Sequence, residues 1–236
     1  MPMTQSLEDG AGLTRLLSWL SPAFPTGGFS YSHGLEYAVE SGRVGDAAAL
    51  GDWVAGCLRH GSGRQDAVLF ACSHRALAQR DWASIEEIAV LAHALRGTSE
   101  LALESRAQGE AFLGTLREAW PHPELDRLAQ HLQRIDCPPS HSLAVAAGCA
   151  LHGIPLEPAL TAFLLAFAQN LVSAGVRLVP LGQTEAQRVI SDLEACIGET
   201  AAEVLETPLH DAGSAGLVVD LCSAKHETQY TRLFRS

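Results

Sequence analysis

The amino-acid sequence predicts an all-α protein, a single-domain bundle of about ten helices. Apolar residues return every three or four positions along most of the chain, as they do on one face of a helix. Alanine and leucine, which favour helices, are abundant, and alternating apolar and polar runs are almost absent. Only residues 217–221 have the composition of a strand, so we expect one strand there at most.

Glycines and prolines divide the chain into the expected helices. Ser84 and Glu87 fit a capping box at the start of one helix, and a continuous apolar face predicts one long helix after Gly182. No linker is long or low in complexity, so one domain covers 1–236, with 1–11 expected to be flexible and 207–236 expected to be a C-terminal tail. The helices are expected over residues 12–20, 31–41, 46–60, 64–79, 82–96, 99–119, 124–134, 141–152, 156–178 and 184–206.

One predicted helix, 156–178, is apolar almost all round. Glu157 and Arg177 are the only formal charges between residues 137 and 184. Such a helix is buried by its own fold or by another subunit. We therefore expect most of it in the core and part of its surface at a subunit interface.

Charge and composition exclude several classes of function. The 236 residues carry a net charge of −11, with 16 Lys and Arg against 27 Asp and Glu, which disfavours binding to nucleic acid or to an anionic membrane. Lys225 is the only lysine, and its neighbours do not form a phosphate-binding P-loop, so any nucleotide hydrolysis belongs to a partner. The six cysteines form no CxxC pair, and we find neither a signal peptide nor a membrane-spanning apolar run. These features predict a soluble cytoplasmic protein.

Two cysteine–histidine pairs are candidate metal ligands. Cys57 with His60, and Cys149 with His152, each stand three residues apart on a predicted helix. If the two pairs met, they would supply four ligands suited to zinc or nickel. The alternative, which we favour, is that each cysteine is a small core residue and each histidine ends a helix before a glycine.

The segment 21–36 combines restricted and permissive backbone with aromatic side chains. Two prolines stiffen it, and the adjacent Gly27 and Gly28 permit backbone conformations closed to other residues. Ser30 is expected to cap a helix that begins near Tyr31. The segment is either a rigid connection packed on the core or an exposed docking surface, whose aromatic anchors would be Phe24, Phe29 and Tyr31.

This segment resembles the N-terminal motif of the urease accessory protein F (UreF) family. Residues 104–112, 174–184 and 230–236 also resemble blocks of that family, in the same order. The resemblance covers roughly residues 12–236, and only the stretch 207–220 matches no block.

The resemblance implies a non-enzymatic, all-helical, cytoplasmic urease maturation factor. Family members join accessory proteins D (also called H) and G, form homodimers within that assembly, and support GTP-dependent nickel insertion into urease apoprotein. It implies no intrinsic cofactor, because G hydrolyses GTP and accessory protein E delivers nickel. The alternative is an intrinsic nickel carrier using the Cys/His pairs. Nickel uptake in equilibrium dialysis, lost on Cys57→Ala or His152→Ala, would support that alternative.

The resemblance and side-chain chemistry together give a set of candidate interface residues. We expect the tail to become ordered when partner D binds, with Arg232 then contacting the region around Tyr31. Glu36 and Arg177 are charges within apolar sequence, for which we expect buried pairing or partner contact. The candidates are Phe24, Gly27, Gly28, Phe29, Ser30, Tyr31, Glu36, Arg177, Gln183, Arg232, Leu233 and Phe234.

Overall fold

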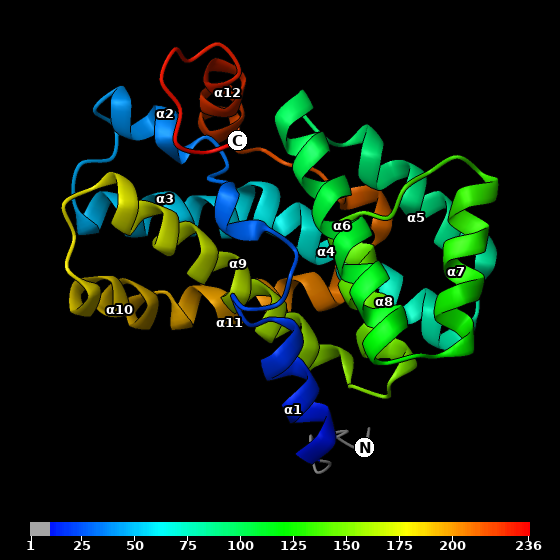
Figure 1. Cartoon of the computed structure of the whole chain (residues 1–236). Coiled ribbons are helices and arrows are strands. Elements are labelled where there is room, and N and C mark those ends of the chain that lie inside the picture. The colour runs from blue at the N-terminus through cyan, green and yellow to red at the C-terminus, as the bar shows by residue number, and fades with distance from the viewer. Residues whose placement is uncertain (1–9) are drawn as a thin grey trace.

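The computed structural model describes residues 10–236, and within that range it contains helices and turns but no strand (Figure 1). The predicted all-α fold is confirmed. The α-helices are α1 (Gly10–Trp19), α2 (Leu35–Glu40), α3 (Ala47–His60), α4 (Ser62–Gln79), α5 (Trp82–Ala94), α6 (Ser99–Ala119), α7 (Pro123–Arg134), α8 (His141–Leu151), α9 (Leu156–Leu178), α10 (Gln183–Asp192), α11 (Glu194–Glu206) and α12 (Leu217–His226). Two short 3-10 helices, η1 (Gly28–Ser30) and η2 (Leu209–Asp211), complete the list.

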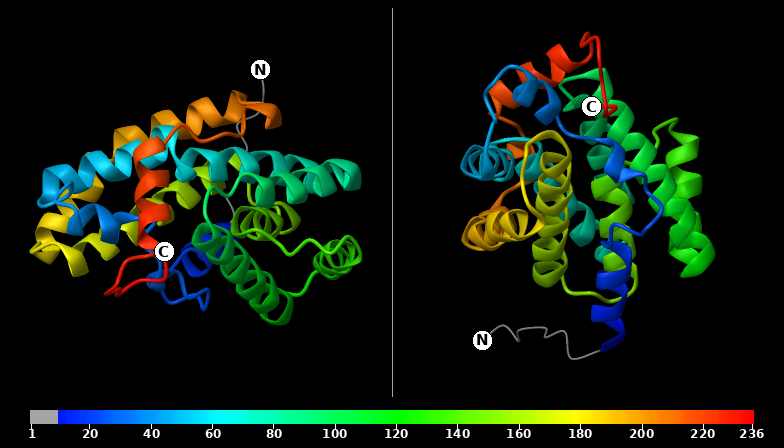
Figure 2. Two further views of the ribbon diagram at one scale, coloured as in Figure 1. Left: turned by 90° about the horizontal axis from the view of Figure 1, so that it is seen from above. Right: turned by 60° about the vertical axis from the view of Figure 1, so that its left-hand side comes forward.

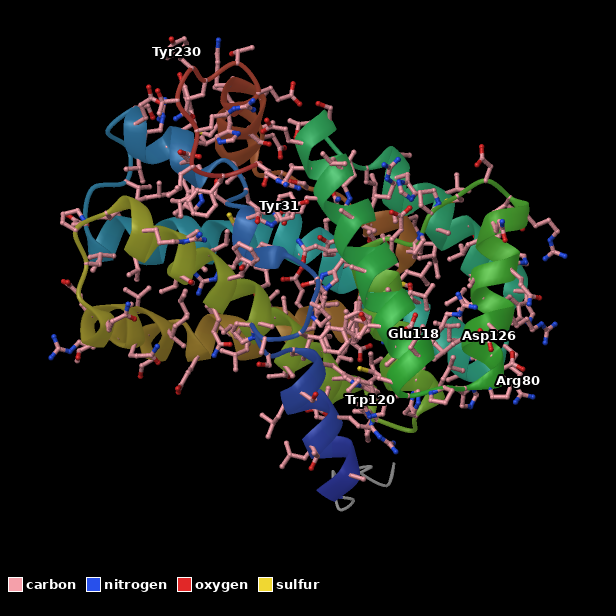
Figure 3. All side chains as sticks on the ribbon, viewed as in Figure 1. Tyr31, Arg80, Glu118, Trp120, Asp126 and Tyr230 are labelled. Atoms are coloured by element: carbon pink, nitrogen blue, oxygen red, sulfur yellow. The ribbon has the colours of Figure 1, made fainter. Side chains whose placement is uncertain are left out.

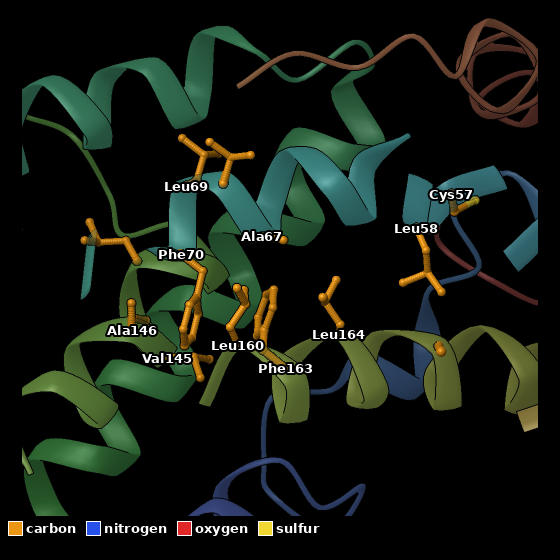
Figure 4. Packing of buried hydrophobic residues seen from close by; sticks show 14 of the residues in the cluster. Cys57, Leu58, Ala67, Leu69, Phe70, Val145, Ala146, Leu160, Phe163 and Leu164 are labelled. Atoms are coloured by element: carbon orange, nitrogen blue, oxygen red, sulfur yellow. The ribbon is translucent and has the colours of Figure 1, made fainter. Parts of the chain in front are cut away.

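The core is built around α4, which packs against α3, α5, α8, α9 and α11. Phe70 of α4 stacks on Phe163 of α9 with ring centroids 4.9 Å apart, and Val145 of α8 lies beside this pair (Figure 4). By length and mean hydropathy α9 could cross a membrane, yet half of its most apolar window is buried inside this fold. Burial against several neighbouring helices explains why α9 carries so few charges.

Helix starts in the structure follow simple capping chemistry, with one correction. The side chain of Asp81 accepts a hydrogen bond from Ser84 N at 3.2 Å, so Asp81 caps α5. The capping box predicted at Ser84 and Glu87 is therefore wrong, although the helix begins where we expected. Asp46, Thr98 and Ser140 cap their helices in the same way.

Residues 217–221, the only segment in which we allowed for a strand, form the start of α12. One side of α12 packs onto α2, with Val219 and Cys222 buried, and this tertiary contact overrides the β-propensity of the valines. Gly34 makes the approach possible, since a Cβ at that position would lie 2.6 Å from the backbone N of Ser223.

Two further helix boundaries differ from expectation. The helix predicted from residue 31 begins at Leu35, because Tyr31 is extended while His33 and Gly34 adopt left-handed conformations with φ of 52° and 74°. The long helix predicted over 184–206 is divided at Leu193 into α10 and α11.

The two chain ends also bear on the predicted organisation. Of the segment 1–11, residues 10 and 11 belong to α1, and the rest lies outside the described residues. Within the predicted tail 207–236, residues 217–226 are helical as α12.

A pair of glycines in α6 tests how closely the helices must approach. A Cβ at Gly109 would collide with the carbonyl oxygen of Pro139, whereas a Cβ at Gly114 would meet no atom within 4 Å. We expect Gly109→Ala to lower the free energy of unfolding by about 1–3 kcal/mol through overpacking. Gly114→Ala should raise it by about 0.5–1 kcal/mol, because alanine favours a helix interior. Chemical denaturation measures both, and equal effects would contradict this packing.

Candidate functional site

Residues 227–236, called the tail from here on, fold back onto the body of the chain between α2 and η1 (Figure 1 and Figure 2). The backbone N of Arg235 donates a hydrogen bond to the carbonyl oxygen of Ser30 at 2.8 Å. The backbone N of Ser32 in turn donates to the carbonyl oxygen of Ser236 at 2.9 Å. The tail and the segment 21–36, called the bend from here on, are therefore joined through their backbones.

The carboxylate of Glu36 holds the tail from α2. It is buried, and it accepts hydrogen bonds from the backbone N of Leu233 at 2.6 Å and of Phe234 at 2.9 Å. It also lies 3.0 Å from Nε2 of His226 on α12. One buried carboxylate thus satisfies two main-chain donors of a segment that has no helix of its own.

A second carboxylate, Glu100 at the start of α6, faces the same histidine. Its two oxygens lie 2.7 Å from Nδ1 of His226 and 2.6 Å from the guanidinium of Arg232. In the described structure Arg232 therefore pairs with Glu100. The contact that we expect between Arg232 and the region around Tyr31 once partner D has bound stays a prediction. Arg235 and Ser236 approach that region through their backbone atoms.

Arg177 of α9 links the bend to the tail. Its guanidinium donates to the carbonyl oxygen of Phe29 at 2.6 Å and lies 4.1 Å from the centre of the Phe234 ring. This cation–π contact covers Phe234, which is buried, while neighbouring Leu233 is 63% exposed. Gln183 is exposed at the first position of α10 and makes no hydrogen bond with the tail in the described structure.

Two of the three aromatic residues of the bend are buried and one is exposed. Phe24 is buried with its ring centroid 4.8 Å from that of Phe112, and Tyr31 is buried too, so these two aromatics anchor the bend to the core. Phe29 is 67% exposed on η1. Gly27 has φ of 74°, a backbone conformation that favours glycine.

Beneath the tail lies a network of buried polar groups centred on Glu104 of α6. Its carboxylate lies 2.9 Å from Nε2 of His33, and it accepts hydrogen bonds from Gln108 and from the Ser236 hydroxyl at 2.9 and 2.8 Å. Burial opposes charge on His33, but the Glu104 carboxylate outweighs this effect and raises the pKa of His33 above its ordinary value. The network ties the tail to the interior.

A cavity of about 110 Å³ adjoins this network. The ion pair of Asp66 and Arg96 lines one part of it, and burial lowers the pKa of His141, another lining residue, to about 4. Two buried polar atoms in its wall, Nε1 of Trp19 and Oγ of Ser105, have no hydrogen-bond partner among the described residues. A cavity of this size has room for several water molecules.

The two Cys/His pairs do not form a ligand set. Cys57 and Cys149 are buried in α3 and α8, and burial raises the pKa of both thiols, that of Cys57 to about 12. His60 is exposed at the end of α3, whereas a ring nitrogen of His152 lies 2.9 Å from the carbonyl oxygen of Gly148. Within residues 10–236, no group of three or more His, Cys, Asp or Glu is placed to hold a metal ion.

Together, the tail and the bend form part of the surface of the protein. The residues that hold the tail and that sequence reasoning did not single out are Glu100, Glu104 and His226. Glu104 lies in one of the blocks that resemble the UreF family, so a signal for it existed, but no pattern marked Glu100 or His226.

A family model and similar known proteins share one description. A family model described as UreF matches residues 44–194. A urease accessory protein UreF of Bradyrhizobium sp. (strain ORS 278) is 50% identical over 236 residues, covering 100% of this chain and 97% of that protein. The UreF proteins of Granulibacter bethesdensis and Rhodopseudomonas palustris (strain HaA2) are 49% and 47% identical, over 99% and 98% of this chain and 97% and 96% of their own lengths.

The lowered pKa of His141 predicts a loss of stability in acid. Native His141 stays neutral down to about pH 4, whereas in the unfolded chain it takes up a proton below about pH 6.5. The unfolded state therefore binds more protons between these values, and the free energy of unfolding falls as pH falls. Relative to His141→Gln, the unchanged chain should lose up to about 1.4 kcal/mol per pH unit in denaturant titrations. His210→Gln changes an exposed histidine and is the control, so its free energy of unfolding should vary with pH as that of the unchanged chain does. If His141→Gln also varied with pH in the same way, the lowered pKa of His141 would be contradicted.

Proposed function

The chain belongs to the UreF family of urease accessory proteins, and we propose that it acts as a scaffold joining accessory proteins D (H) and G during urease maturation. Membership makes it a urease maturation factor, not an enzyme. In the proposed assembly it supports GTP-dependent insertion of nickel into urease apoprotein in the cytoplasm. In this proposal partner G hydrolyses GTP, which agrees with the lack of a P-loop lysine in this sequence, and partner proteins handle nickel.

The observation that carries this proposal is the display of apolar side chains by the docked tail. Tyr230 is fully exposed at the outer edge of the molecule (Figure 3), and Leu233 is largely exposed. Phe29, linked to the tail through Arg177, is exposed as well. Exposed aromatic and aliphatic anchors are typical of protein interfaces, so this surface is the proposed contact with accessory protein D.

The proposal includes an ordering step in the tail. Residues 228–231 hydrogen-bond only to α12 in the described structure, and most of them are exposed. The contacts with the bend and with Glu36 come from residues 233–236. Residues 228–231 make so few contacts that they fray readily, and binding of partner D would complete their ordering.

We also propose that two copies of the chain pair through α1 and α9. α1 projects beside α9 (Figure 1), and a groove of about 720 Å³ runs between them, lined largely by apolar side chains. Leu13 and Leu17 are exposed along its edge. A two-fold interface uses the same patch on both copies, so this apolar face of one copy would cover the same face of the other.

Binding to partner D tests the tail surface. We expect Leu233→Ala to weaken the affinity of the whole chain for accessory protein D about tenfold, because it removes an exposed anchor. Phe234→Ala should weaken it as well, by undocking the tail, whereas Leu233→Ala leaves docking intact. Val90→Ala, on exposed α5 surface, is the matched control. Unchanged affinity in a Tyr230→Ala, Leu233→Ala double variant would refute this contact.

Sedimentation velocity of the complex with D tests the pairing of copies. Leu17→Glu places a charge in the proposed interface and should prevent two copies of the chain from pairing. The complex with D should then contain half as many copies of each chain and sediment more slowly. Leu103→Glu, at an exposed position on α6, should leave the assembly unchanged. Loss of pairing in the α6 variant alone would place the interface elsewhere.

A further inference from the structure

The outward side of α12 is apolar and exposed at the edge of the molecule (Figure 1). Leu217 and Leu221 stand four residues apart, so they share one side of the helix, and Val218 lies next to them. Their side chains are 78%, 53% and 51% exposed in that order. The opposite side of α12, with Val219 and Cys222, is buried against α2. Three adjacent apolar side chains in solvent form a patch, called the α12 patch from here on, of the kind that marks an interaction site.

Two cations without partners border the α12 patch. Lys225 is exposed four residues after Leu221, on the same side of the helix. Arg43 is exposed just beyond the end of α2. Burial raises the pKa of the Cys222 thiol and the nearby charge of Arg43 opposes this rise, so Arg43 lies beside α12. Neither side chain makes a hydrogen bond or an ion pair with the described residues.

The acidic side chains at this helix lie toward α6, away from the α12 patch. Glu227 accepts hydrogen bonds from the backbone N and the hydroxyl of Ser99 at 2.8 and 2.6 Å, so its carboxylate is occupied at the start of α6. The carboxylate of Asp220 lies near Gly97, where an added Cβ would be 3.9 Å from it. The positive charges beside the α12 patch are thus free to pair with another molecule, although the chain as a whole carries −11.

We propose that the α12 patch is a docking site for a helix of a partner protein, in which an apolar stripe is flanked by Asp or Glu side chains. Packing of this stripe on Leu217 and Leu221 removes apolar surface from water. The flanking carboxylates then pair with Lys225 and Arg43. The sign of the charges selects the partner, because a basic helix would bring like charges together.

A second copy of the chain is less suited to this site than a partner protein. An exposed apolar stripe flanked by acids also occurs on α5, where Val90 lies beside Glu86 and Glu87. Contact of α12 in one copy with α5 in the next would use two different surfaces. Such heterologous contacts build rings or filaments, not the two-fold pair proposed for α1 and α9.

Titration of the whole chain with a designed helical peptide tests the docking site without any natural partner. The probe is a stapled helix with leucines along one side and glutamates beside them, and the comparison probe carries lysines in place of the glutamates. In NMR spectra the acidic probe should shift the amide signals of Leu217, Val218 and Leu221. It should bind about tenfold more tightly than the basic probe.

Variants of exposed side chains separate the apolar contribution from the charge. Leu221→Ala should weaken binding of the acidic probe about tenfold. Val90→Ala, which truncates a side chain of similar exposure on α5, is the matched control and should leave binding unchanged. Lys225→Glu should remove the preference for the acidic probe, whereas Lys225→Arg should keep it. An unchanged melting temperature shows that each variant is folded.

Three results would overturn the proposal. One is equal affinity for the acidic and the basic probe, and another is a set of shifted signals that lies outside α12. The third is the absence of binding at millimolar probe. The peptide measurements do not depend on the proposed function.

Photo-crosslinking from position 221 in the complex with accessory proteins D and G identifies the natural occupant and separates this inference from the proposed function. Crosslinks to an acidic helix of D or G support the docking site, whereas crosslinks to another segment or to a second copy overturn it. If Leu221→Ala assembles as the unchanged chain does while Leu233→Ala loses D, the docking site is refuted and the proposed function stands. Binding of the acidic probe by a chain that fails to assemble with D and G would support the docking site and refute the proposed function.

Discussion

The buried carboxylate of Glu36 is the contact on which the arrangement of the functional face depends. It joins three parts of the chain, since it projects from α2, pairs with His226 of α12 and accepts the amides of the tail. A carboxylate removed from water is stable only while such donors surround it. Each of these elements therefore holds the others in place. The buried carboxylate of Glu36 thus fixes where the exposed residues at the end of the tail lie.

The need of buried polar groups for hydrogen-bond partners also explains why blocks far apart in the sequence meet at one place. The bend at 21–36, the block at 104–112, Arg177 and the tail contribute the hydrogen bonds around Glu104 and Phe234. Close backbone approaches allow this convergence, at Gly34 against α12 and at Gly109 against the turn before α8. The four blocks that resemble the UreF family thus form one structural unit, although the matched family model spans only residues 44–194.

Much of the fold could be predicted from the sequence, because helical periodicity and turn residues act locally. The apolar faces, most boundaries and the all-α class depend on such local signals. The errors arose where tertiary contacts decide the outcome. Residues 217–221 form a helix because the side of α12 that buries Val219 packs on α2, and the start of α2 depends on left-handed His33 and Gly34. Likewise Arg232 could be singled out as a charge in the tail, but its partner Glu100 lies 132 residues away and carries no recognisable pattern.

Because side chains alternate along the end of the tail, the spacing of its residues matters. From Leu233 to Ser236, successive residues point in turn toward solvent and toward the body. Within these four residues, which face a side chain shows is therefore set by its place in the alternation. Insertion of a single amino acid between Phe234 and Ser236, both anchored to the body, would break this alternation while leaving the tail's composition nearly intact. Spacing, as much as chemical identity, is what this segment has to preserve.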